Sequence, residues 1–260
     1  MEESINILSI KDKNNEYNNF SSRFEIYDYI GIKEYISKYT PIIFNQGNSK
    51  MCVPCAVALL LYIQNYKRVG DYMNIPDPLY IFGSSKIDAT NGISYTTAME
   101  VLKDGCSYIN RNGLNEYNTK YNTYTYDQAQ EYSKEKRLNK NIDFNYFKIN
   151  SYYYLHNSNE IKFAITNFGA VNIIIPVYKS FFTIKEYENG NCYIQLFDDN
   201  IEKLHSYHML TIIGWKGKYW IVQSSYGSEF GDKEGKAYLT MDYPIKEAWT
   251  CISNNLKHVV

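Results

Sequence analysis

The stretch Gln46-Gly47-Asn48-Ser49-Lys50-Met51-Cys52 decides the fold of this chain, together with the later stretch His208-Met209-Leu210-Thr211-Ile212-Ile213-Gly214-Trp215. Cys52 opens an apolar run that predicts a helix, Gln46 lies six residues before it, and His208 opens a β-rich run. Acyl transfer through a thiol requires a nucleophile, a base and a donor for the developing oxyanion. The two stretches therefore predict a thiol active site split between distant parts of the sequence.

The segment after His208 extends this pattern. It reads Lys218-Tyr219-Trp220-Ile221-Val222-Gln223-Ser224-Ser225-Tyr226-Gly227-Ser228-Glu229-Phe230-Gly231-Asp232. The chain thereby resembles the papain-like cysteine peptidases of the C1 type, which carry roughly Tyr-Trp-x-Val-x-Asn-Ser-Trp-Gly at this place. Ser224, 16 residues after His208, stands where the resemblance places an orienting asparagine, and Tyr226 stands where it places a shielding tryptophan. The chain is identified as a divergent member of that family.

The resemblance implies a role for each matching residue. Cys52 is the nucleophile, and His208 forms an ion pair with it and protonates the leaving group. The Gln46 side chain and the Cys52 backbone N–H form the oxyanion hole, and Ser224 orients His208 less firmly than an asparagine would. Gly92 is either a glycine that pairs with substrate backbone or a turn glycine, and Tyr226 joins it as a substrate-binding residue. No cofactor and no metal are implied.

The expected fold class is α+β, with a helical lobe, an antiparallel β-barrel-like lobe and the active site in the cleft between them. We expect an N-terminal arm at residues 1–38 and a papain-like catalytic domain at 39–260. The helical lobe is expected at about 39–146 and the β lobe at about 147–260. Only a short apolar strand candidate near Ile7 stands out in the arm.

Local patterns predict the main elements. The run 55–63 is apolar on all sides, which predicts a buried helix, and a second helix is expected from Ser94, as N-cap, to Asp104, with Gly105 as its stop. Residues 107–146 are polar and predict surface loops and short helices. Short β-rich runs predict strands at 171–177, 192–197, 209–214, 219–223 and 236–240.

Composition narrows the function classes. The 260-residue chain has a net charge of -1 and a pI near 6.4, which excludes the basic footprint typical of nucleic-acid or anionic-membrane binding. Its 28 tyrosines could stack bases, but they lack interleaved basic residues, so strand and surface roles are favoured. The sequence shows no secretory signal and no apolar run long enough to span a bilayer. Five cysteines without a disulfide framework favour a cytoplasmic protein.

Cys52-Val53-Pro54-Cys55 also matches the thioredoxin-like Cys-x-Pro-Cys redox motif, although no βαβ pattern surrounds it. Placing the nucleophile at Cys52 keeps the Gln46 spacing and leaves Cys55 as a small buried helix residue. Zinc binding is disfavoured, because no second pair of ligands has the right spacing.

Three functions remain open. The first is a cysteine peptidase or amidase that acts on a peptide substrate. The second is an amide-forming acyltransferase that takes an acyl thioester, with a carrier protein as its partner, and the short arm and altered triad favour it. The third is an inactive papain-fold binding module, which the joint presence of Gln46, Cys52 and His208 opposes.

Overall fold

The computed structural model describes residues 18–24, 26, 31–70, 73–86, 89, 91–186, 190–197 and 202–253. The Ile7 strand candidate therefore lies outside the described residues. The α-helices and 3₁₀ helices are α1 Phe20–Arg23, α2 Cys52–Val69, α3 Pro78–Gly83, α4 Tyr95–Asp104, η1 Arg111–Gly113, α5 Leu114–Tyr121, α6 Tyr126–Leu138, η2 Phe144–Phe147, α7 Ser158–Phe168, η3 Lys179–Phe182 and η4 Gly227–Glu229.

The strands form one large sheet and a small hairpin. They are β1 Asn18–Asn19, β2 Glu34–Ile36, β3 Asn74–Pro76, β4 Tyr108–Asn110, β5 Ile149–Tyr154, β6 Val171–Val177, β7 Lys185–Glu186, β8 Cys192–Tyr193, β9 Ser206–Lys216, β10 Tyr219–Gln223, β11 Lys236–Thr240 and β12 Glu247–Ser253. The large sheet runs β1-β5-β12-β6-β9-β10-β11-β8-β7, with β2 paired to β9, and β3 pairs with β4. Its pairs are antiparallel except β1 with β5 and β11 with β8.

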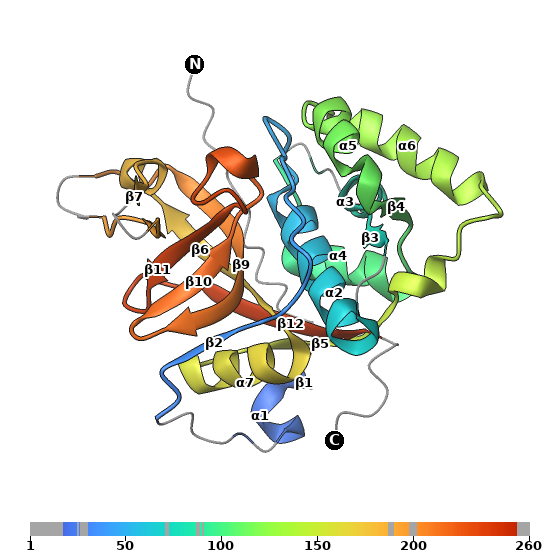
Figure 1. Ribbon diagram of the computed structural model, residues 1–260. Coiled ribbons are helices and arrows are strands. Elements are labelled where there is room, and N and C mark those ends of the chain that lie inside the picture. Colours follow the sequence, from blue (N-terminus) through green and yellow to red (C-terminus); the bar gives the residue numbers. More distant parts are fainter. Residues whose placement is uncertain are drawn as a thin grey trace.

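The strands curl around one side of the molecule, and most helices gather on the other (Figure 1). The α+β class and the papain-like two-lobed architecture are confirmed. The β lobe is not a closed barrel, however, because the described end strands β1 and β7 do not pair with each other. β12 and β5 continue the sheet from the β lobe beneath the helical lobe, which ties the two lobes together (Figure 1).

Most of helix α2 is buried on all sides, as the apolar run 55–63 predicts. All residues from Cys52 to Asn65 are buried. Polar side chains of the sheet attach it to the β lobe: Asn172 Nδ2 donates to the Ala56 carbonyl at 2.9 Å. At the far end of the helix, Gln64 Nε2 donates to the Cys251 carbonyl at 2.6 Å. The helix therefore lies between the lobes, and its first residue is held in a fixed position.

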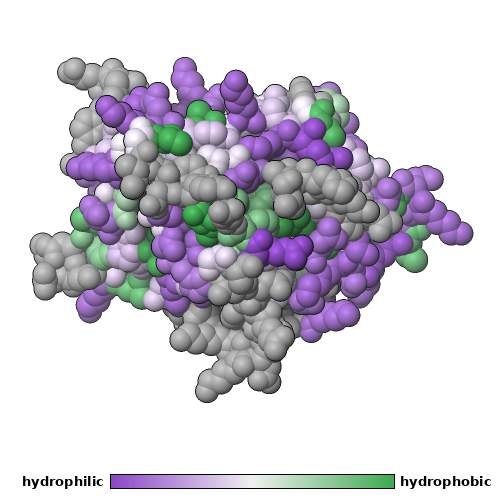
Figure 2. Space-filling model, turned by 90° about the horizontal axis from the view of Figure 1, so that it is seen from below, coloured by the Kyte–Doolittle hydropathy of each residue, from purple (hydrophilic) through white to green (hydrophobic). Residues whose placement is uncertain are grey.

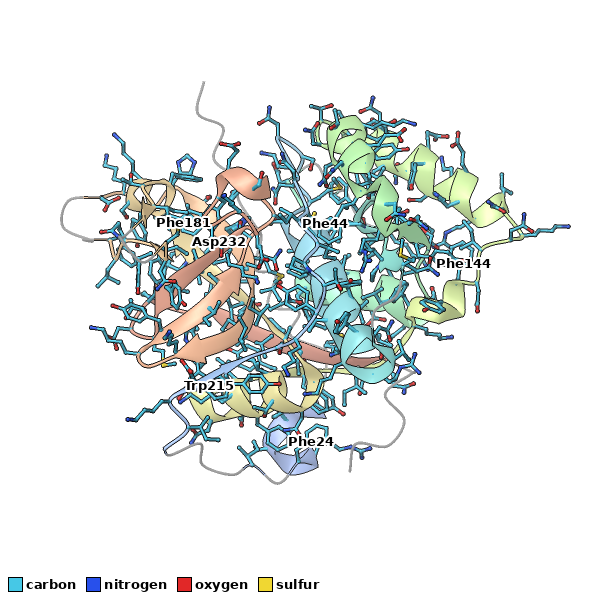
Figure 3. All side chains as sticks on the ribbon, in the orientation of Figure 1. Phe24, Phe44, Phe144, Phe181, Trp215 and Asp232 are labelled. Atoms are coloured by element: carbon cyan, nitrogen blue, oxygen red, sulfur yellow. The ribbon has the colours of Figure 1, made fainter. Side chains whose placement is uncertain are left out.

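Two hydrophobic cores stabilise the fold. One surrounds α2 and the other helices of the helical lobe, and the second fills the β lobe around Trp215 and Trp220. Figure 3 shows Phe44 near the boundary of the two lobes, Phe144 in the helical lobe and Phe181 in the β lobe. Seen from below, polar side chains cover most of the described surface, and hydrophobic ones form only small patches between them (Figure 2). No described helix is long and apolar enough to cross a membrane.

The local predictions can be compared with these elements. α4 is confirmed in detail, because the Ser94 hydroxyl caps the Thr97 N–H at 3.1 Å and Gly105 ends the helix with φ of 103°. The strands at 171–177, 219–223 and 236–240 are confirmed with their full bounds, and 209–214 lies within β9. The prediction for 192–197 was too long, because only Cys192 and Tyr193 form a strand. β5, β12 and α7 were not predicted.

Segments ahead of residue 39 pack on the β lobe. Phe20 of α1 is fully buried against Phe168, and β2 pairs with β9 through Tyr35 and Trp215. Tyr35 stacks on Trp215 with ring centroids 5.3 Å apart. The boundaries at residues 38 and 146 stay predictions.

Candidate active site

Cys52 is the first residue of α2 and is 5% exposed. Met51 occupies the N-cap position and offers no side-chain cap, so the N–H groups of the first turn are not satisfied by a capping side chain. The N–H groups of Cys52 and Val53 and that of Met209, from β9, lie where they stabilise a charge on the Cys52 sulfur. Because Met209 follows His208, this contact places Cys52 beside the backbone that carries the predicted base.

A short backbone joint connects the segment before Cys52 to the segment after β10. Asn45 and Tyr226 form an isolated antiparallel bridge. Beside it, the Gln46 N–H donates to the Ser225 carbonyl at 2.8 Å, and the Gly227 N–H donates to the Phe44 carbonyl at 3.0 Å. The joint brings together the two sequence stretches that were predicted to share one site.

The side chain of Gln46 is fixed from both stretches. Its amide Nε2 donates to the Ser49 carbonyl at 3.0 Å, and its Oε1 accepts a hydrogen bond from Ser225 Oγ at 2.6 Å. Gln46 is 3% exposed. An amide nitrogen carries two hydrogens, and only one has a partner among the described residues. The second N–H is therefore free to donate to an oxyanion.

His208 lies in β9 opposite Ile175 of β6 and is 2% exposed. Its Nε2 is hydrogen-bonded to Ser224 Oγ at 3.2 Å, so the structure brings together the predicted base and the predicted orienting residue. Phe181 packs edge-on against the imidazole with ring centroids 6.0 Å apart. With the proton on Nε2, as a donor to Ser224, Nδ1 is left as the basic nitrogen.

Tyr226 covers the imidazole of His208 as a nearly parallel ring. The ring centroids are 4.5 Å apart and the planes differ by 16°. The Tyr226 hydroxyl lies 3.4 Å from His208 Nδ1. Because the rings are stacked, this oxygen lies over the imidazole face, whereas the Nδ1 lone pair points outward in the ring plane. The hydroxyl is therefore a weak partner, and Nδ1 remains available to a thiol.

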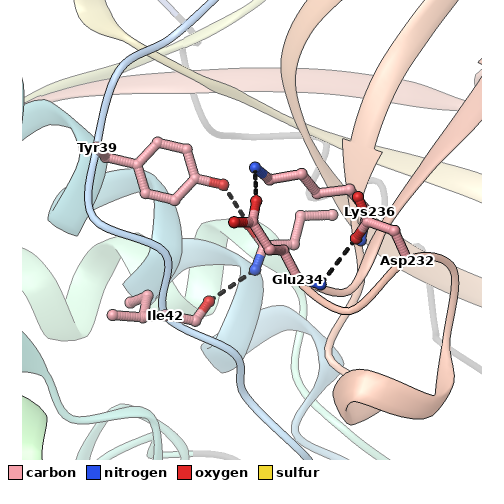
Figure 4. Close-up of polar contacts among 6 residues, drawn as sticks. Tyr39, Ile42, Asp232, Glu234 and Lys236 are labelled. Carbon is pink, nitrogen blue, oxygen red and sulfur yellow. Dashed lines mark hydrogen bonds and ion pairs between the residues drawn. The ribbon is translucent and has the colours of Figure 1, made fainter. Parts of the chain in front are cut away.

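Gln223, which precedes Ser224, faces away from the histidine, as the alternation along a strand predicts. Figure 4 shows Tyr39 and Ile42, the two partners of its amide: Nε2 donates to the Ile42 carbonyl at 2.6 Å, and Oε1 accepts a hydrogen bond from the Tyr39 hydroxyl. Nearby, the Lys236 N–H donates to Asp232 Oδ1 at 2.9 Å. Gln223 thus holds the lobes together and does not orient His208.

Burial opposes charge on both reactive groups. It raises the pKa of Cys52 to about 11, although the neighbouring N–H groups and Lys50 act in the opposite direction. It also lowers the pKa of His208 to about 3. Burial therefore favours a neutral thiol and a neutral imidazole over the ion pair expected from the sequence. Desolvation is the physical reason.

Gly92 lies next to the segment that leads to Cys52. It has φ of 97°, a conformation that favours glycine. A Cβ atom at this position would lie 3.3 Å from the Lys50 carbonyl oxygen. The Gly92 N–H donates to the Ala89 carbonyl at 2.9 Å, which is a turn contact. Both interpretations of Gly92, as a turn residue and as a residue near the substrate, are compatible with this position.

Two functional contacts were not predicted from the sequence. Ser225 fixes the Gln46 amide, and Phe181 packs on His208. Ser225 directly follows Ser224, so its place in the matched motif was the available signal, whereas Phe181 lies in a segment without any motif. In the part of the chain that the structure describes, no group of His, Cys, Asp and Glu side chains could hold a metal ion.

Comparisons with known proteins concern the family and the fold of the chain. Residues 91–255, more than half of the chain, match the family model of the papain family cysteine proteases. The matched region contains His208 and Ser224 and begins after Gln46 and Cys52, so the latter two are placed by the structure. A comparison with curated protein sequences gave no match.

Solved structures of cysteine proteases share the fold. Xylellain, a cysteine protease from Xylella fastidiosa, has 15% identity and a TM-score of 0.61, with 85% of this chain and 86% of that chain covered. Procathepsin B S9 from Trypanosoma congolense has 13% identity and a TM-score of 0.63, with 92% and 81% covered. The Carica candamarcensis cysteine protease CMS1MS2 has 12% identity and a TM-score of 0.61, with 85% and 99% covered. At these identities the likeness shows the fold alone.

Proposed function

The chain belongs to the papain family of cysteine proteases, and from this premise we propose that it is a cysteine peptidase or amidase that works through an acyl-thioester on Cys52. The observation that carries the proposal is the shared position of three groups. The thiol of Cys52 lies beside the backbone that follows His208, the imidazole is held by Ser224, and the Gln46 amide keeps one free N–H.

In the proposed reaction, His208 Nδ1 takes the proton of the Cys52 thiol as the sulfur attacks the substrate carbonyl. In this scheme the other imidazole proton lies on Nε2, which donates to the Ser224 hydroxyl oxygen. The oxygen of the tetrahedral intermediate receives hydrogen bonds from Gln46 and from the Cys52 backbone N–H. The protonated His208 then gives its proton to the leaving group, and the acyl-thioester forms.

The second half of the reaction releases the acyl group. A water molecule gives a proton to His208 and attacks the thioester, which regenerates the Cys52 thiol. An amine in place of water would yield an amide, so the acyltransferase predicted from the sequence uses the same intermediate. Water must reach an enclosed site for hydrolysis, since Cys52 is 5% and His208 2% exposed.

The test is direct capture of the acyl-enzyme. The full chain is mixed with p-nitrophenyl acetate, and both p-nitrophenolate release and the intact mass are followed. We expect one acetyl group on Cys52, with strongly slowed formation in His208→Ala. Cys192→Ala is the matched control, because Cys192 is also 5% exposed and lies outside the site. The proposal would be refuted if the Cys52→Ala variant were acetylated on other residues as fast as the wild type is acetylated.

Added glycinamide then separates hydrolysis from transfer. A peptidase or amidase releases mostly acetate, whereas an acyltransferase forms mostly acetylglycinamide. If Cys52→Ala retained the full biological effect of the protein, the binding-module function would replace both. The peptide or thioester substrate, the carrier-protein partner and the cytoplasmic location stay proposals.

A further inference from the structure

Cys52 has a second thiol on the same turn of helix. Cys55 lies three residues later in α2, is 3% exposed, and is free, as Cys52 is. In an α-helix, the Cα atoms of residues three apart are about 5 Å apart. Disulfides join residues whose Cα atoms are roughly 4.4–6.8 Å apart. The two cysteines therefore have a Cα separation within the range that a disulfide spans.

Cys55 also lines a small cavity of about 10 Å³, whose other walls include Met209 and Ser224 of the candidate active site. A charge on Cys52 raises the pKa of Cys55, which shows that the two thiols interact. The acyl-transfer reaction gives Cys55 no role. It is thus a buried nucleophile next to the catalytic one, with space on the side of the catalytic residues.

The two thiols differ in their ability to react first. Burial disfavours a thiolate at Cys52, but three backbone N–H groups and Lys50 act in the opposite direction there. Burial and the charge of Cys52 both disfavour a thiolate at Cys55. Cys52 is therefore the sulfur that reacts first with an oxidant that reaches the site. Cys55 is the resolving thiol, which can then attack the oxidised Cys52 sulfur.

We propose that Cys52 and Cys55 are a modification site at which hydrogen peroxide forms a reversible intramolecular disulfide, with Cys52 as the attacking and Cys55 as the resolving thiol. The Cys-Val-Pro-Cys sequence at the start of α2 then has a redox role in addition to the peptidase chemistry. The disulfide blocks the nucleophile and protects it from irreversible oxidation.

The reaction balances in two steps. The Cys52 sulfur attacks one peroxide oxygen as His208 takes the thiol proton; an S–O bond forms, the O–O bond breaks, and the departing hydroxide takes that proton to become water. The Cys55 sulfur then attacks the Cys52 sulfur, the S–S bond forms, the S–O bond breaks, and hydroxide leaves with the Cys55 proton as water. Two thiols are oxidised by two electrons, and one peroxide is reduced to two waters.

The bond requires a local adjustment. Side chains three apart on a helix have Cβ atoms about 5–6 Å apart, whereas a disulfide needs roughly 3.5–4.5 Å. The first turn of α2 must therefore tighten by about 1–2 Å. A strained disulfide is easily reduced. We expect dithiothreitol to restore the free thiols quickly.

The test uses the full chain treated with hydrogen peroxide and analysed by mass. Both cysteines lie in the tryptic peptide 51–67, because Lys50 and Lys67 are its cleavage sites. We expect this peptide to become lighter by about 2 Da, the mass of two hydrogens, and dithiothreitol to reverse the change. Iodoacetamide labelling of Cys52 should be lost and regained in parallel. These readouts do not require catalysis, so they can succeed even where the peptidase proposal fails.

Two variants separate the proposal from other oxidations. In Cys55→Ala, peroxide should convert Cys52 to sulfinic and sulfonic acids that dithiothreitol cannot reduce. In Cys192→Ala, the disulfide should form as in the wild type. The proposal is overturned if the wild-type peptide only gains oxygen, remains unchanged, or loses hydrogen equally in Cys55→Ala. Should Cys55→Ala fail to fold, the wild-type peptide mass decides the question alone.

Discussion

Replacement of Gln46 gives the sharpest test of the candidate site. Removal of one oxyanion donor typically lowers the rate by about 10²–10³-fold, which is roughly 3–4 kcal/mol of transition-state stabilisation. The Gln46 amide has one N–H bound to the Ser49 carbonyl and one that is free. We therefore expect Gln46→Ala to slow acetylation of Cys52 by p-nitrophenyl acetate within this range.

The same substitution has a structural cost that can be worked out from the contacts. It leaves the Ser49 carbonyl and the Ser225 hydroxyl without their hydrogen bonds to the Gln46 side chain. Each unpaired buried group costs about 1–3 kcal/mol, compared with a total stability of about 5–15 kcal/mol for a typical domain. The backbone bonds of Gln46 to Ser225 and Ser49 remain. The variant should fold, with a lower free energy of unfolding measured in urea.

Ser225→Ala is the matched control, because it removes one of these hydrogen bonds and keeps the donor. If the lost hydrogen bond contributes about 1.4 kcal/mol to the positioning of the Gln46 amide, Ser225→Ala should slow acetylation about tenfold. Iodoacetamide provides the second control, since alkylation of a thiol forms no oxyanion. Iodoacetamide should therefore label Cys52 of the Gln46→Ala variant at nearly the wild-type rate. If labelling and acetylation slow equally, Gln46 acts by holding the loop, and the oxyanion assignment is wrong.

Three further predictions concern His208 and its neighbours. The pKa of His208 is lowered to about 3, so the stability that this group contributes is present above pH 6.5 and is lost as pH falls towards 3. The free energy of unfolding measured in urea should fall by roughly 4 kcal/mol between pH 7 and 3.5. This fall should be smaller in His208→Gln and unchanged in His205→Gln, and an equal fall in all three proteins would contradict the prediction. Ser224→Ala should slow acetylation by roughly 3- to 10-fold through loss of one hydrogen bond, and Ser224→Asn should match or exceed the wild-type rate. If Ser224→Ala were acetylated at the wild-type rate, Ser224 would have no role in orienting His208. Tyr226→Phe should leave the acetylation rate within about twofold of the wild-type rate, because the hydroxyl lies over the ring face. Tyr226→Ala should raise the pKa of His208 in an NMR titration. A large loss of acetylation rate in Tyr226→Phe would instead show a hydrogen bond from the hydroxyl to Nδ1.

Much of the fold could be predicted because its signals are local. Ser94 and Gly105 mark the two ends of α4 by chemistry contained within that helix. The all-apolar run after Cys52 predicts a buried helix with no knowledge of its neighbours. β5 and β12 gave weaker signals, because both contain polar residues that become buried only when the strands meet, such as Thr250 opposite Tyr153.

The site was predictable in its residue types and not in its contacts. The spacing of Gln46, Cys52 and His208 indicated which groups would meet. It could not show that Ser225 reaches across 179 residues to the Gln46 amide, because that bond depends on the joint between two distant segments. Nor could it show the desolvation that opposes the ion pair, since burial arises only from the packed lobes.

That desolvation affects how the thiol reacts. Burial raises the pKa of Cys52 and lowers that of His208, so it disfavours moving the proton from the thiol to the imidazole in the resting site. The neutral pair is therefore favoured until a carbonyl arrives. As the sulfur attacks, the negative charge passes to the carbonyl oxygen, where the Gln46 N–H can receive it. Proton transfer and attack are then coupled, and the oxyanion donor contributes to both.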